Sequence, residues 1–84
     1  MLINVLYFAR LREAFGLSGE RLELPADSTV EDVIQQLLAR GDVWKTELTG
    51  GRVVRVAVNQ TMATSATVLK AGDELALFPP VTGG

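Results

Sequence analysis

The chain has 84 residues, 48% of them apolar, and because this length can bury one hydrophobic core but not two, we expect a single domain without a bound cofactor. Its formal net charge of −2 argues against direct nucleic-acid binding, which requires clustered lysine and arginine side chains. The absence of cysteine and histidine excludes disulfides, thiolate or imidazole metal sites and histidine-based catalysis, and fits a reducing cytoplasm.

The first segment of the chain, Leu2 to Ala9, is rich in β-branched and aromatic residues and polar only at Asn4, which predicts a central strand. It lacks the basic region and cleavage site of a signal peptide, and no segment of the sequence approaches a membrane span. Arg10 to Phe15 suits a short helical turn. The glycines of Gly16–Gly19 suit a loop, and the alternation of Glu20 to Leu24 predicts a second strand of a hairpin.

The most regular pattern is an apolar stripe at helical spacing. Its members are Val30, Val33, Ile34, Leu37 and Leu38. Ser28 and Glu31 have the form of a capping box before this stripe, and Arg40-Gly41 suits a helix end. Together these signals predict a helix over about Thr29 to Arg40.

The segment after the helix, Asp42 to Leu48, fits no pattern well. We expect its Trp44 to pack onto the end of the helix rather than to bind a ligand. Gly50-Gly51 marks a break in the chain, and alternating valines predict a strand over Arg52 to Val58.

The remaining chain is predicted to be irregular from Asn59 to Thr67. A turn at Lys70 to Asp73 then leads to a last strand from Glu74 to Phe78. One helix packed across one face of a mixed sheet is the simplest way to bury the apolar stripe, so the fold class is predicted to be α+β.

The C-terminus is the feature with the clearest chemical meaning. After a domain formed by residues 1–78, Pro79 and Pro80 should hold the backbone extended, so residues 79–84 are expected to project as a stiff tail. Gly83 and Gly84 have no Cβ and suit a narrow channel. Such a tail can bring its own carboxylate into a partner's active site, where prior activation as an acyl-adenylate made from ATP would allow conversion to a thiocarboxylate. An inert, frayed terminus is the alternative.

Two phenylalanines lie close to this tail in the predicted sheet. Phe8 shares a face of its strand with polar Asn4, and Phe78 shares one with charged Glu74, so both phenylalanines are expected on the face opposite the core. The core face should carry Ile3-Val5-Tyr7 and Leu75-Leu77. Exposed aromatic residues beside a functional tail indicate a docking surface, unless an irregular segment covers them.

Four segments, spread over nearly the whole chain, resemble the small subunits of molybdopterin synthase, which are ubiquitin-like sulfur carriers. They are Val5-Leu6-Tyr7-Phe8-Ala9-Arg10-Leu11-Arg12-Glu13, Val58-Asn59-Gln60-Thr61, Ala71-Gly72-Asp73-Glu74 and Phe78-Pro79-Pro80-Val81-Thr82-Gly83-Gly84. The last is specific to the family, whereas the others are weak individually. The resemblance implies a ubiquitin-like β-grasp fold with an extended C-terminal tail.

The same resemblance implies that Gly84 becomes a thiocarboxylate after adenylation by an enzyme related to ubiquitin-activating enzymes, which would use ATP and Mg²⁺. Gly83 would be the residue slim enough to pass the channel. A large subunit, joined with this chain in a heterotetramer, would then convert cyclic pyranopterin monophosphate to molybdopterin. The carrier itself would be non-catalytic. Partner contacts map to Phe8, Met62, Phe78, Pro79, Pro80, Val81 and Thr82.

Other functions are open at this point. The nearest alternative is a carrier for another client, such as thiamine thiazole synthesis or tRNA thiolation, or a ubiquitin-like modifier of lysines. A different class is a binding module with an inert tail. A self-contained enzyme is disfavoured, because nothing in the chain supplies a base, a nucleophile or a metal.

Overall fold

The structure, a computed structural model, describes residues 1–49 and 54–80. The predicted break at Gly50-Gly51, the first two residues of the strand predicted from Arg52, and Val81 to Gly84 lie outside these residues. In chain order the elements are β1 (Leu2–Tyr7), α1 (Arg10–Phe15), β2 (Gly19–Glu23), α2 (Val30–Leu38), α3 (Asp42–Leu48), β3 (Arg55–Val58), β4 (Thr61–Met62) and β5 (Glu74–Phe78).

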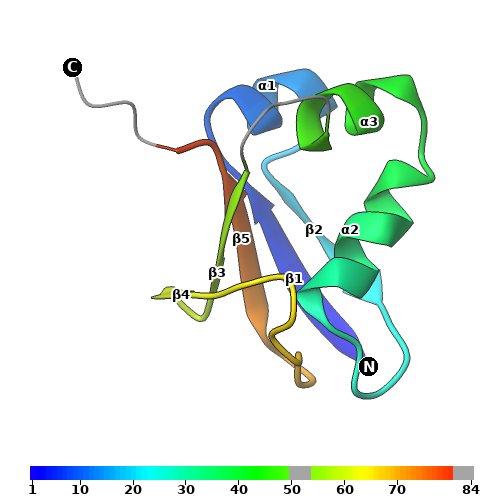
Figure 1. The fold of residues 1–84 in the computed structure, drawn as a ribbon, viewed down its shortest axis with the longest axis vertical. Helices are drawn as coiled ribbons and strands as arrows, with labels where there is room; N and C mark the ends of the chain where they lie inside the picture. The colour runs from blue at the N-terminus through cyan, green and yellow to red at the C-terminus, as the bar shows by residue number, and fades with distance from the viewer. Residues whose placement is uncertain (50–53, 81–84) are drawn as a thin grey trace.

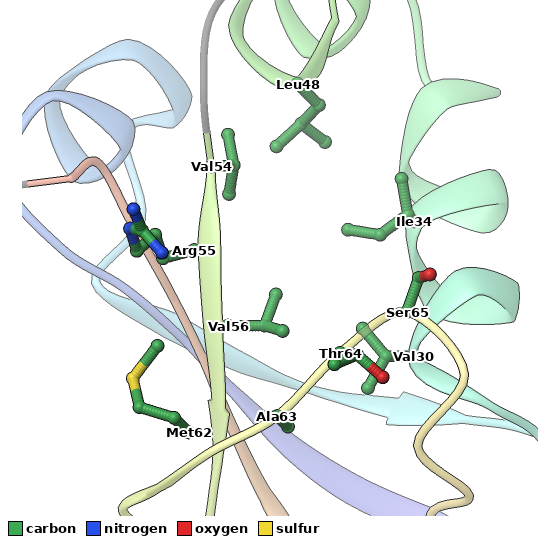
Figure 2. A pocket seen from close by; sticks show the side chains of 10 residues that line it. All are labelled: Val30, Ile34, Leu48, Val54, Arg55, Val56, Met62, Ala63, Thr64 and Ser65. Atoms are coloured by element: carbon green, nitrogen blue, oxygen red, sulfur yellow. The ribbon is translucent and has the colours of Figure 1, made fainter.

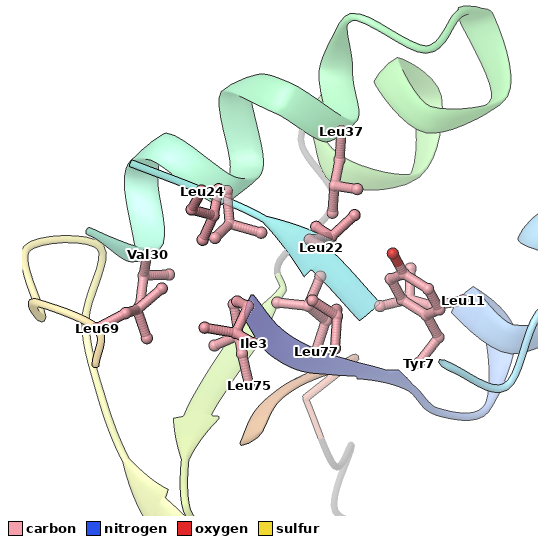
Figure 3. Packing of buried hydrophobic residues seen from close by; sticks show 12 residues of the cluster. Ile3, Tyr7, Leu11, Leu22, Leu24, Val30, Leu37, Leu69, Leu75 and Leu77 are labelled. Atoms are coloured by element: carbon pink, nitrogen blue, oxygen red, sulfur yellow. The ribbon is translucent and has the colours of Figure 1, made fainter. Parts of the chain in front are cut away.

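The five strands form one mixed sheet in the order β2-β1-β5-β3-β4 (Figure 1). β1 runs antiparallel to β2 and parallel to β5, and β5 runs antiparallel to β3. α2 lies across one face of this sheet, so the predicted α+β arrangement is confirmed (Figure 3). No helix in the described part of the chain has the length and apolarity needed to cross a membrane.

The core lies between α2 and the sheet (Figure 3). Alternate residues of β1 and β5 are buried there, as the sequence pattern predicts. The buried side chains of these two strands are Ile3, Val5, Tyr7, Leu75 and Leu77, and they pack with Val30, Val33 and Leu37 of α2. The face of the sheet opposite α2 therefore takes no part in this core.

The N-terminal cap of α2 lies one residue later than predicted. Thr29 is the cap, since its Oγ1 accepts from the backbone N–H of Asp32 at 3.3 Å, and the Asp32 carboxylate accepts from the Thr29 N–H at 2.8 Å. The predicted pair of Ser28 and Glu31 is wrong because Ser28 is buried and its hydroxyl donates to the carbonyl of Pro25 at 2.7 Å. The helix also ends earlier than predicted, at Leu38.

The ambiguous segment after α2 is the helix α3. Trp44 packs near the end of α2, as expected, although its aromatic neighbours belong to α1 and β1. Its ring stacks on Phe15 of α1, with centroids 3.7 Å apart, and meets Tyr7 of β1 edge-on at 5.7 Å. The guanidinium of Arg40, just beyond α2, lies 4.7 Å from the centre of the Trp44 ring. The aromatic cluster thus joins α1, α3 and β1.

The region predicted as irregular contains the short strand β4, so that prediction is wrong for Thr61 and Met62. β4 pairs with β3 through a turn in which Asn59 and Gln60 have φ values of 51° and 69°. No glycine marks this turn, which is why the sequence pattern missed it.

The side chain of Asn59 joins this turn to the turn before β5. Its amide donates to the Asp73 carboxylate at 2.9 Å, and its Oδ1 accepts from the backbone N–H of Glu74 at 3.0 Å. The other Asp73 oxygen accepts from the N–H of Lys70 at 2.8 Å. Two of the four segments that carry the family resemblance are therefore held together by direct contact.

We expect the substitution Asn59→Ala to destabilise the domain by about 2 kcal/mol, because it removes the bridging hydrogen bonds and places alanine at a positive φ. Asn59→Gly, which removes only the hydrogen bonds, should cost about 1 kcal/mol. Urea unfolding at neutral pH measures both. Two variants as stable as the parent would show that the bridge contributes nothing.

Candidate docking face and tail root

The tail begins where two parallel strands end. β1 and β5 run in the same direction, so Phe8, directly after β1, and Phe78, the last residue of β5, lie at one edge of the sheet (Figure 1). The N–H of Phe8 donates to the carbonyl of Leu77 at 3.2 Å. Phe8 is 44% exposed, and Phe78 is half-buried. Pro79 and Pro80 follow, both half-buried and outside any strand or helix.

The face of the sheet opposite α2 carries a row of apolar residues across four strands. Leu6 pairs with Ala76, Ala76 with Ala57, and Ala57 with Met62. Met62 is 59% exposed at the end of this row. We call this row together with the two phenylalanines the docking face, which consists of Leu6, Phe8, Ala57, Met62, Ala76 and Phe78.

The sequence pattern placed Phe8 and Phe78 on this face correctly. Met62 was assigned to it only through the family resemblance, because β4 was not predicted. The alternation that places Phe78 on this face also places Ala76 there, but an alanine does not by itself indicate a docking residue. Val81 to Gly84, the functional end of the tail, lie outside the described residues.

The turn between β1 and α1 has unusual backbone geometry. Ala9 has φ 51° and ψ −125°, a conformation that favours glycine. Holding an alanine there costs on the order of 1–3 kcal/mol. Hydrogen bonds from Leu11 N to Phe8 O (3.1 Å) and from Glu13 N to Ala9 O (3.2 Å) fix the turn. This turn ends β1 beside the root of the tail and sets the position of Phe8.

A polar cluster on the opposite side of β1 from the docking face joins β1, β2 and the segment after α2. The Tyr7 hydroxyl donates to Glu20 of β2 at 2.6 Å, and Arg40 donates two hydrogen bonds to the same carboxylate, at 2.6 and 2.7 Å. The Arg40 contact holds the pKa of the Glu20 carboxyl below its ordinary value. Burial, reinforced by Glu20, raises the pKa of the Tyr7 hydroxyl, which therefore stays protonated as a donor.

This cluster makes the stability of the domain depend on pH. Because the pKa of Glu20 is lower in the folded chain than in the unfolded one, its stabilising effect is present above the ordinary carboxyl pKa, about 4.3, and is lost as the pH falls through the folded pKa. Glu20→Gln should therefore lose less stability than the parent between neutral pH and about pH 3. Urea unfolding at several pH values measures the difference. In an Arg40→Gln background the Glu20 substitution should change the pH dependence much less.

A groove of about 490 Å³ lies on the helix side of the sheet, between β3 and α2 (Figure 2). Val56 points into it from β3, and Val54 from just before that strand, opposite Ile34 of α2, whereas Arg55 and Met62 border it from the other side of β3. The groove and the docking face therefore adjoin, and both include Met62. Within residues 1–49 and 54–80, no group of three or more acidic side chains is placed to hold a metal ion.

Comparison with protein-family models matches residues 5–84 to the ThiS family. The molybdopterin synthase sulfur carrier subunit of Haemophilus influenzae is 43% identical to this chain over 83 residues, which cover 99% of this chain and 100% of that protein. The protein of the same name from Escherichia coli is 44% identical over 84 residues, with 99% and 100% coverage. The resemblance found in the sequence motifs is confirmed.

Solved structures show the same fold. The crystal structure of small archaeal modifier protein 1 from Haloferax volcanii superimposes with a TM-score of 0.85 at 32% identity, covering all of both chains. A complex of subunits 1 and 2 of molybdopterin-converting factor from Helicobacter pylori contains a chain that matches at TM-score 0.71 and 25% identity, again over both full lengths. A ubiquitin-like protein from Caldiarchaeum subterraneum, at TM-score 0.57 and 18% identity over 99% and 100% of the two chains, shares the fold alone. The ubiquitin-like β-grasp fold is therefore confirmed.

Proposed function

This chain belongs to the ThiS family, and we propose that it carries sulfur for molybdopterin synthesis as the small subunit of a molybdopterin synthase. The observation that carries this proposal is the similarity, over nearly full lengths, to two sulfur carrier subunits of that enzyme. The position of two partly exposed phenylalanines at the root of the Gly-Gly tail supports it, because a carrier must dock before its tail can reach a partner's active site.

The chemistry proposed for the tail takes place at the carboxylate of Gly84. Attack of this carboxylate on the α-phosphorus of ATP, in an activating enzyme that binds ATP and Mg²⁺, forms an acyl-adenylate and releases pyrophosphate. A sulfur donor then displaces AMP, and the product is a thiocarboxylate. This chain supplies the acyl group and no catalytic residue. Gly83, lacking a Cβ, lets the tail pass through a narrow channel.

The proposed partner in sulfur delivery is the large subunit of the synthase. The docking face would bury its apolar side chains against that subunit while residues 79–84 enter the active site. The solved complex of the two subunits of molybdopterin-converting factor from Helicobacter pylori supports this arrangement, since one of its chains has the same fold as this one. In the complete enzyme this chain then acts as a sulfur-donating subunit and the large subunit as the catalyst.

The test is intact-mass spectrometry of the protein isolated from cells that make molybdenum cofactor. We expect a fraction of the chain to carry one sulfur in place of one oxygen, located in the C-terminal peptide. An unmodified carboxylate, even after incubation with ATP, the activating enzyme and a sulfur source, would contradict the proposal. It would favour a binding module that uses the docking face alone.

The structural similarity to small archaeal modifier protein 1 favours a second candidate, conjugation of Gly84 to lysines of other proteins. The two candidates share activation at Gly84 but differ in the product. Conjugation leaves the segment Ala71 to Gly84 on target lysines after trypsin digestion, because Lys70 is the last trypsin site of the chain, and removal of the gene would leave molybdopterin intact. Under the first proposal, removal of the gene abolishes molybdopterin and leaves thiolated tRNA unchanged.

A further inference from the structure

A charged residue lies beside the apolar side chains at the root of the tail. Arg55 of β3 pairs with Phe78 of β5 in the register of the sheet and is exposed. Figure 2 shows its side chain on the same side of β3 as Met62, and both residues also border the groove on the helix side. Arg55 therefore borders the docking face at the place where the tail begins.

The described part of the chain gives the Arg55 side chain no charged or hydrogen-bonding partner. Two other arginines are tied into the fold, since Arg40 binds Glu20 and Arg10 binds Glu47 at 2.8 Å. The Arg55 side chain makes no ion pair or hydrogen bond with any residue of 1–49 or 54–80. The acidic residue of β5 on the same face, Glu74, is four positions from Phe78, or about 13 Å along the strand. At physiological salt that separation exceeds the Debye length of about 8 Å.

Docking would change the surroundings of this cation. A partner that covers Phe78 and Met62 also brings its own surface against the neighbouring guanidinium, where an opposite charge is favoured. A complementary surface must then supply an acceptor. The planar fork of an arginine matches a carboxylate, which accepts two parallel hydrogen bonds from it.

The acceptor belongs to the surface around the tail channel rather than to the reacting centre. In an extended tail the six residues from Pro79 to Gly84 span about 20 Å, which separates Gly84 from the root. Arg55, at the root, faces the rim of the channel. A contact at an interface rim acts mainly on the rate of association and on its salt dependence.

We propose that Arg55 pairs with an aspartate or glutamate at the rim of the tail channel of the large subunit, and that this ion pair steers the carrier onto that partner. The inference rests on the proposed function, because it takes the large subunit as the occupant of the docking face. It extends that function by assigning a charged recognition residue to a surface otherwise built from apolar side chains.

The test is the association rate of the full chain with the large subunit of the same organism, measured by stopped-flow fluorescence at low and physiological ionic strength. Arg55→Glu should slow association about tenfold at low salt and reverse its salt dependence, while Arg55→Gln should give an intermediate rate with a weak salt dependence. Lys45→Glu makes the same change in net charge on the exposed side of α3, and it should associate at nearly the parental rate.

Each outcome bears on a separate claim. If the parent binds and Arg55→Glu associates at the same rate with the same salt dependence, this inference is wrong while the proposed function stands. If Lys45→Glu slows association as much as Arg55→Glu, net charge explains the effect and the specific pair is refuted. If the parent neither binds the large subunit nor gains a thiocarboxylate, the proposed function fails and this inference falls with it. Circular dichroism verifies that each variant is folded.

Discussion

Deletion of Gly84 should abolish sulfur transfer while leaving the domain as stable as the parent. The deletion moves the terminal carboxylate back by one residue, about 3.5 Å, and a misplacement of even 1 Å at a reacting centre can cost about 100-fold in rate. Among the described residues, Leu77 is the last that is fully buried, so the core is unchanged. Mass spectrometry of the C-terminal peptide measures the thiocarboxylate, and thermal unfolding measures stability.

The matched control is Gly83→Ala, which keeps the length of the tail and adds only a Cβ. We expect this variant to be adenylated or delivered more slowly than the parent, because a methyl group narrows the fit in a channel. A melting temperature that collapses on deletion of Gly84 would show that the tail supports the fold. Full sulfur transfer by the shortened chain would show that the terminal position is not the reacting one.

Phe78→Ala should weaken binding to the large subunit far more than it weakens the fold. A buried aromatic anchor at an interface typically contributes at least about 2 kcal/mol, or roughly 30-fold in affinity. Phe78 is only half-buried in the free domain and lies on the face opposite the core, so we expect its loss to cost about 1 kcal/mol of stability. Isothermal titration with the large subunit and urea unfolding give the two quantities.

The adjacent residue provides the control. Leu77 points into the core and is fully buried, so Leu77→Ala should destabilise the domain by about 2–5 kcal/mol. The fraction of Leu77→Ala that remains folded should bind the large subunit with nearly parental affinity. A loss of about 3–5 kcal/mol of stability in Phe78→Ala would instead place that ring in the core and refute its assignment to the docking face.

Regular patterns in the sequence predicted most of the fold. Alternation in the first and last strands identified the buried faces, since a one-residue shift there would expose every core side chain. The stripe of α2 was equally clear. Its cap was misplaced because Ser28 and Thr29 are both followed three residues later by an acidic residue, and only tertiary contacts decide between them. The Ser28 hydroxyl is already used by Pro25, which leaves Thr29 as the cap.

Elements without a local signal were missed or left undecided. β4 is two residues long, and its turn uses Asn59 and Gln60 at positive φ instead of glycine. α3 begins at Asp42, its N-cap residue Gly41 has no side chain to cap it, and it contains no fully buried residue. The docking face was predicted only in part. Ala57 and Ala76 become neighbours through the pairing of β3 with β5, and the sequence alone does not give the register of these strands. Arg55 is read as a recognition residue only once β3 is placed beside β5.

The parallel pairing of β1 with β5 joins the first and last strands of the chain. Contacts between such distant segments form only when the whole domain folds. An unfolded or partly folded chain would still end in Gly-Gly, but it would not bring Phe8 and Phe78 together at the base of the tail. Enzymes that recognise both features at once would accept only molecules that have completed folding. Under the proposed function, this topology would limit activation of Gly84 to folded carriers.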